Sequence, residues 1–183
     1  ARVMDAVYAN RRVFATLASD PSASGLRSVF FVEKLDVDTV ASDWEYVYDS
    51  GDGNFYFYPA ITLVGSSASA PIVVGSSYVA PAVPALQYAS SVVKFFTAQG
   101  SSGTGPIVVA GQGLGAYVAL DSNSKNRWGD YSGADYDWSC GEVWTALEHA
   151  GTANTWQTRI NRWDVETSPT HIFSDDFDDG HYF

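Results

Sequence analysis

The stretch of sequence that decides the fold class runs from Asn126 to Trp163 and reads NRWGDYSGADYDWSCGEVWTALEHAGTANTWQTRINRW. Apolar and polar side chains alternate in residues 133–137, 142–149 and 156–163, and this alternation is the period of a β-strand. Between the first two segments, the turn 137–141 (DWSCG) has hairpin chemistry, because short polar side chains accept backbone N–H groups and Gly adopts positive φ. The stretch therefore predicts consecutive antiparallel strands.

The same stretch resembles a known family. RWGDYSGADYD, a turn, GEVW and then NTWQTRI are similar to the closing blades of secreted bacterial β-propellers with sialidase-like repeats, which are also called BNR or Asp-box repeats. The Asp-box pattern is Ser-x-Asp-x-Gly-x-x-Trp, and the chain places Asp137, Ser139, Gly141 and Trp144 there, with Ser and Asp exchanged. Asp-boxes are turn motifs, so the resemblance implies a fold rather than a catalytic site. It also implies a bacterial protein that is secreted or lies on the cell surface.

Short alternating segments continue through the rest of the chain, and together they number about eleven or twelve. Residues 3–8 and 13–18 flank a turn at Asn10 and Arg11 and predict a hairpin, whereas residues 86–96 fit either a strand pair or a short helix. Because a propeller blade has four strands, the chain supplies about three blades. The predicted fold class is all-β, with antiparallel four-stranded blades of a partial β-propeller. A β-sandwich is the alternative.

About three blades are too few for a closed ring, since propellers have at least about four. An unclosed set of blades exposes strand edges and apolar faces, which need cover. We therefore expect another protein chain or further copies of this chain to complete the ring. Residues 1–165 form the expected propeller portion. Residues 166–183, which include a cluster of four Asp around Phe177, form an expected acidic C-terminal tail or linker.

Composition limits the partners of the protein. The 183 residues carry a formal net charge of −11 and include only ten Lys and Arg. Such a surface repels phosphate backbones, so we expect no nucleic acid partner. No apolar run approaches the ~20 residues of a transmembrane helix, so no membrane span is expected. A hydrophobic content of 46% suits a packed globular core.

No catalytic or cofactor-binding residue is assigned from the sequence. A sialidase-type reaction needs clustered Arg, a Tyr–Glu nucleophile pair and an acid, and none of the Arg residues stands in the motif that the resemblance would require. The three His residues are too scattered for a zinc motif, and no G-x-S-x-G elbow is present. The single Cys140 fits a small buried hydrophobe better than a reactive thiol. The sequence thus favours a protein that is not an autonomous enzyme.

Calcium is the cofactor that the sequence suggests. Asp130, Asp135 and Asp137 form a candidate metal site, with Asp121 nearby in sequence, because hard cations take several oxygen ligands. The alternative is that these carboxylates accept turn N–H groups.

Two functions remain open. The first is a non-catalytic portion of a secreted or cell-surface propeller that serves assembly or ligand binding, with surface Trp and Tyr as platforms for a glycan. The second is part of a secreted glycoside hydrolase, or of another hydrolase, whose catalytic residues lie partly on another chain.

Overall fold

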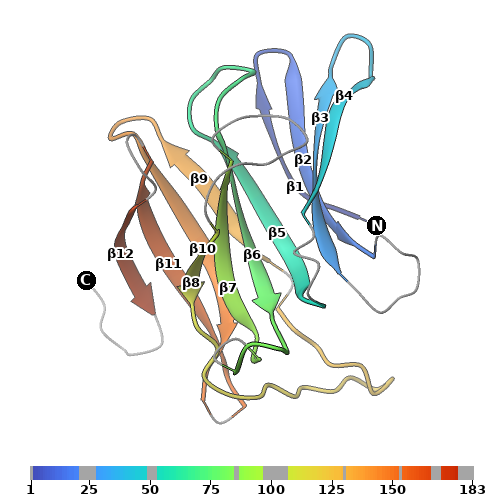
Figure 1. The fold of residues 1–183 in the computed structure, drawn as a ribbon, viewed down its shortest axis with the longest axis vertical. Coiled ribbons are helices and arrows are strands. Elements are labelled where there is room, and N and C mark those ends of the chain that lie inside the picture. Colours follow the sequence, from blue (N-terminus) through green and yellow to red (C-terminus); the bar gives the residue numbers. More distant parts are fainter. Residues whose placement is uncertain are drawn as a thin grey trace.

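The computed structural model describes residues 2–20, 28–48, 53–84, 87–96, 107–129, 131–152, 154–165 and 170–176. These residues form twelve strands in three four-stranded antiparallel sheets, and none of them lies in an α-helix (Figure 1). Within the described ranges, no helix has the length and apolar character needed to cross a membrane.

In every sheet, the spatial order of the strands follows their order along the chain. The first sheet contains β1 (Arg2–Ala9), β2 (Arg12–Ser19), β3 (Val29–Asp36) and β4 (Ser42–Tyr48). The middle sheet contains β5 (Phe55–Leu63), β6 (Ile72–Val79), β7 (Ser90–Phe96) and β8 (Ile107–Gly111). The third sheet contains β9 (Gly133–Asp137), β10 (Glu142–Ala150), β11 (Trp156–Asp164) and β12 (Thr170–Asp176).

The predicted fold class is confirmed at the level of an all-β chain with three antiparallel four-stranded sheets. The sandwich alternative is not what forms, because a sandwich has two layers and this chain has three sheets. The strands predicted at 133–137, 142–149 and 156–163 are β9, β10 and β11, which match those ranges to within one residue. The completion of a ring by further blades stays a prediction.

The middle sheet lies between the other two, so both of its faces are covered (Figure 1). Along β6, Ile72 and Val74 join the core shared with the first sheet, whereas Val73 joins the core shared with the third. Every residue of β7 is buried. Burial on both faces explains why these strands read as nearly continuous apolar runs, while a sheet with one wet face alternates apolar and polar residues.

The first strands of the three sheets lie next to one another. β5 contacts β1 on one side and β9 on the other, and the three strands share a recess of about 260 Å³ that includes Ala9, Leu63 and Tyr136. Each sheet therefore begins at a common line and extends outward, in the order of strands that a propeller blade has.

Two segments differ from the simplest interpretation of the sequence. Residues 55–63 form the single strand β5 although Pro59 interrupts them, because the register shifts between Phe57 and Ala60 and Tyr58 adopts a φ of 51°. This irregularity accommodates a proline, which has no N–H for the ladder. Inside the expected acidic tail, Thr170–Asp176 forms β12 and pairs with β11. For residues 86–96 the sequence left a strand pair or a short helix open, and the structure forms the single strand β7 over Ser90–Phe96.

Candidate functional site

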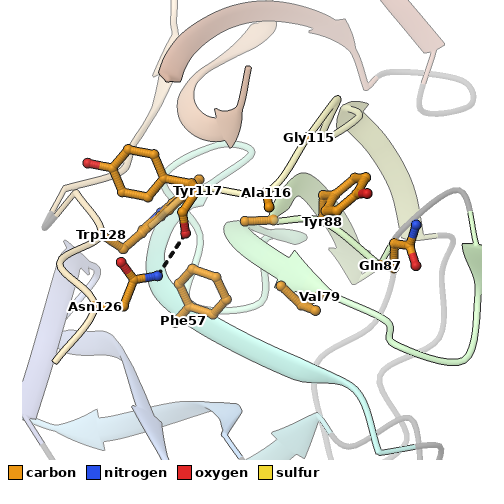
Figure 2. A pocket seen from close by; sticks show the side chains of 10 residues that line it. Phe57, Val79, Gln87, Tyr88, Gly115, Ala116, Tyr117, Asn126 and Trp128 are labelled. Atoms are coloured by element: carbon orange, nitrogen blue, oxygen red, sulfur yellow. Dashed lines mark hydrogen bonds between the residues drawn. The ribbon is translucent and has the colours of Figure 1, made fainter. Parts of the chain in front are cut away.

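An aromatic hollow lies where the β8–β9 connection crosses the middle sheet (Figure 2). Its volume is about 430 Å³, which is within the range of small-ligand sites. We call it the aromatic hollow and define it by its lining residues: Phe57, Val79, Gln87, Tyr88, Ala89, Gly115, Ala116, Tyr117, Asn126 and Trp128. The connection itself runs along the lower end of the molecule in Figure 1.

Four aromatic side chains from three separate segments surround the hollow. Phe57 comes from β5, Tyr88 from the β6–β7 connection, and Tyr117 and Trp128 from the β8–β9 connection. The Trp128 ring lies edge-to-face with both Phe57, at 6.0 Å between centroids, and Tyr117, at 5.3 Å. This geometry is favourable for aromatic pairs and holds the rings in fixed orientations. All four rings remain partly exposed, so they offer apolar surface to a ligand.

Two asparagine side chains hold the β8–β9 connection in place. Asn154, from the β10–β11 turn, accepts the Val118 N–H and donates to the Val118 carbonyl oxygen at 3.1 Å. Asn126 acts in the same way within the connection, because its amide accepts the Ala119 N–H at 2.7 Å and donates to the Tyr117 carbonyl oxygen at 2.9 Å (Figure 2). A loop without strand pairing thus satisfies its backbone groups through side-chain amides.

The turn at the tip of the connection has its own cap. Asp121 accepts the N–H groups of Lys125 at 3.0 Å and Asn123 at 2.8 Å. These two bonds favour the charged carboxylate and hold the pKa of Asp121 below its usual value. The sequence analysis placed Asp121 near the candidate metal site, and the structure gives this side chain a turn-capping role.

Trp128 is anchored to the middle sheet. Its indole N–H donates to the Ser77 hydroxyl at 3.2 Å. Next to it, Gly129 passes so close to Glu148 that a Cβ at this position would lie 1.9 Å from the carboxylate. A larger residue at position 129 would therefore need the Glu148 side chain to move, so the connection passes close to β10 at this point.

The chemistry of the aromatic hollow is neutral. No Asp, Glu, His, Lys, Arg or Cys is among the described residues that line it. Its polar groups are the amides of Gln87 and Asn126 and the hydroxyls of two Tyr. Such a surface suits a neutral ligand with both C–H faces and hydroxyl groups, because rings pack against C–H groups while amides and phenols exchange hydrogen bonds. General acid–base catalysis lacks a carboxyl or imidazole group there.

Two of the three candidate metal residues lie on the first strand of the third sheet. Asp130 falls outside the described residues, whereas Asp135 and Asp137 lie on β9. Asp137 accepts the Ser139 hydroxyl at 2.6 Å and the Ser139 N–H at 2.8 Å, and these bonds lower the pKa of Asp137. Asp135 is exposed and accepts the N–H of Tyr136 at 2.9 Å.

The described part of the chain contains no group of three or more His, Cys, Asp or Glu that could hold a metal ion. The turn-capping alternative therefore describes what Asp137 does in the structure. Calcium binding by Asp130, Asp135 and Asp137 stays a prediction.

Cys140 is exposed, so the expectation of a buried hydrophobe was wrong. The residue lies at the tip of the β9–β10 hairpin, where polar turn residues reach solvent. Its thiol donates to Glu142 at 3.1 Å, and this hydrogen bond is the main cause that raises the pKa of Cys140 to about 11. The raised pKa disfavours the thiolate, which is the reactive form of cysteine.

The sequence analysis missed the aromatic hollow. Just before it, the chain passes close to the β6–β7 connection, because a Cβ on Gly113 would lie 2.5 Å from the Ala89 carbonyl oxygen. The missed signal was the pair of aromatic residues, Tyr117 and Trp128, that flank a polar loop rich in Asn and Ser. Their convergence with Phe57 and Tyr88 has no sequence spacing to reveal it.

No protein-family model, curated protein or solved structure matches the chain. The arguments about function therefore rest on the residues and their geometry.

Proposed function

We propose that the chain is a non-catalytic portion of a secreted or cell-surface β-propeller, and that it binds a neutral glycan in the aromatic hollow. Further blades, from another chain or another copy, complete the propeller. The observation that carries the glycan proposal is the hollow itself: four partly exposed rings and two amides, with no charged side chain in its lining.

The charge of the protein narrows the glycan class. A net charge of −11 disfavours anionic sugars, and the hollow contributes no cation to offset this repulsion. The ligand class is thus a neutral oligosaccharide rather than a sialylated one. Ring stacking supplies affinity, and Gln87 and Asn126 supply hydrogen-bonding groups for sugar hydroxyls.

The test is calorimetric titration of the protein with neutral oligosaccharides, such as gluco- and manno-oligosaccharides, with sialyllactose as the anionic comparison. Trp128→Ala and Tyr117→Ala are the test variants. Trp156→Ala is the matched control, because Trp156 is 47% exposed but lies on β11, outside the hollow.

We expect binding of a neutral oligosaccharide that either test variant weakens about tenfold or more, which corresponds to ~1.4 kcal/mol, while the control binds like the wild type. Thermal unfolding of each variant checks that it is folded. Absence of binding across the neutral panel, or equal loss in the control, would contradict the proposal. Turnover of a glycoside by the purified chain would instead favour the hydrolase alternative.

A further inference from the structure

The first sheet has an apolar face that points away from the middle sheet. Its members alternate with residues of the buried core, and none of them belongs to either hydrophobic cluster of the described residues. Val3 and Tyr8 are 56% and 64% exposed. We call this surface the outer face of the first sheet and define it by Val3, Tyr8, Phe31, Glu33, Leu35 and Glu45, which strand register places on one face.

Two glutamates interrupt this apolar surface. Glu33 on β3 pairs directly with Glu45 on β4, and like charges at directly opposite positions destabilise a sheet. Neither carboxylate forms an ion pair with a described residue. An apolar face with a doubled negative charge on its two outer strands, β3 and β4, suits a partner that brings a cation to that point.

The third sheet presents such a cation on the face that points away from the middle sheet. Register places Arg162 beside Trp144, and Ile160 beside Ala146, on this surface, which we call the outer face of the third sheet. The Arg162 guanidinium lies over the Trp144 ring, 5.9 Å from its centroid, and forms an ion pair with Glu142 at 3.6 Å. Its side chain remains 36% exposed, so it can contact a second group.

The three sheets repeat one packing arrangement, and this repeat predicts where Arg162 would contact a further sheet. The middle and third sheets are matched here by the face that each strand presents to the preceding sheet. On the second strands, Ile72 and Val143 are the first residues in the core shared with the preceding sheet, so Val73 matches Trp144. Their partners on the third strands, Phe95 and Arg162, therefore hold matching positions. Phe95 packs on Trp163 of the next sheet, with ring centroids 5.5 Å apart.

The counterpart of Trp163 in the first sheet is Leu35. Trp163 pairs with Val143, the second residue of β10, and Leu35 pairs with Val13, the second residue of β2. Glu33 lies two residues from Leu35 on the same face. If the first sheet of a second copy follows the third sheet as the third follows the middle one, Arg162 therefore contacts Leu35 and the Glu33–Glu45 pair.

We propose that two copies of this chain associate head to tail, with the outer face of the third sheet of one copy packed on the outer face of the first sheet of the other. The same contact made twice closes a ring of two times three sheets, which is within the about four to eight blades of known propellers. This inference rests on the proposed function in one respect, because both require further blades. It names a second copy of the chain as the source of those blades.

The test is charge reversal on each face, with mass measured by light scattering and native mass spectrometry. Wild-type protein is expected at twice the 19.8 kDa of one chain. Arg162→Glu alone, or Glu33→Lys with Glu45→Lys, places like charges in both contacts and is expected to give monomers. Lys125→Glu, an exposed charge reversal in the β8–β9 connection, is the control and is expected to stay dimeric.

Mixing the two kinds of variant is the decisive step. In a mixed dimer one contact is wild type and the other has both charges reversed, so the mixture is expected to form dimers that neither variant forms alone. Circular dichroism of each variant checks its fold. Monomeric wild type, dimers that survive the reversals, or a mixture that stays monomeric would each overturn the proposal. The oligosaccharide titration is independent of this result, so the two proposals can fail separately.

Discussion

Gly75 on β6 faces Leu147 on β10 across the interface between the middle and third sheets, and a Cβ at position 75 would lie 2.7 Å from Leu147 Cδ2. Leu147 is fully buried, so its side chain has little room to move. The absence of a side chain at position 75 thus lets the two sheets approach, and Leu147 fills the space.

We expect Gly75→Val to lower the free energy of unfolding by about 1–3 kcal/mol, because overpacking forces side chains from their rotamers. Gly133→Ala is the comparison, since its Cβ would meet only Ala146 at an ordinary 3.8 Å. Urea unfolding measures both. A double variant, Gly75→Ala with Leu147→Ala, should lose less than the sum of its parts, because each change makes space for the other. Strict additivity would mean that the two residues are not in contact.

Trp163 provides a second measure of the same interface. Its indole N–H donates to the Thr145 hydroxyl at 3.0 Å, and both residues are buried. Trp163→Phe removes this donor and leaves the hydroxyl without it, at an expected cost of about 1–3 kcal/mol. The measurement is the free energy of unfolding in urea. Trp156→Phe, on the exposed part of β11, should change that free energy by much less; similar losses at both positions would contradict this account.

The β9–β10 hairpin should depend on the ionisation of Asp137. The bonds from Ser139 lower the pKa of Asp137 below the ordinary value of 3.8. A carboxyl group with a lowered pKa in the folded state stabilises the protein fully above its unfolded pKa, and this stabilisation is lost as pH falls through the folded value. Asp137→Ala should therefore lower the midpoint of thermal unfolding at pH 7. Below pH 3.8 the midpoints of the variant and the wild type should become more similar, because the wild type loses the same stabilisation there.

Asp135→Ala is the matched control for Asp137, because it changes a neighbouring carboxylate that makes no bond across the turn. The same two variants test the predicted calcium site. If calcium binds there, added CaCl₂ raises the thermal midpoint of the wild type, and either substitution reduces this increase. An equal midpoint with CaCl₂ and with EDTA would leave Asp137 as a turn cap alone.

Cys140 should react slowly with thiol reagents despite its exposure. With its pKa raised from 9.0 to about 11 by the bond to Glu142, the folded chain at pH 8 holds about a hundredfold less thiolate than a free thiol does. We expect labelling with a disulfide reagent at pH 8 to be slower in the folded chain than in urea. Glu142→Gln should accelerate the reaction of the folded chain. Equal rates for wild type and variant would show that Glu142 does not control the thiol.

Local sequence determined most of the strands. The turn at Asn10 and Arg11, where both residues adopt positive φ, and the Gly141 turn closed the predicted hairpins. Alternation predicted β9, β10 and β11 to within one residue. These features depend on neighbours in the chain, and a hairpin register follows from its turn. At residues 86–96 the periodicity left strand and helix open, because a segment buried on both faces has no polar side to reveal its period.

The tertiary structure alone decided which distant residues meet. Phe57, Tyr88, Tyr117 and Trp128 converge because β5, the β6–β7 connection and the β8–β9 connection meet at one place, and no spacing in the chain encodes that meeting. The acidic residues near 137 were adjacent in sequence and therefore visible as a candidate site, yet Asp137 bonds within its own turn. By itself, the sequence determined the strands, the turns and the negative charge. Packing between sheets decided the aromatic hollow and the exposed faces, because both form only where segments far apart in the chain come together.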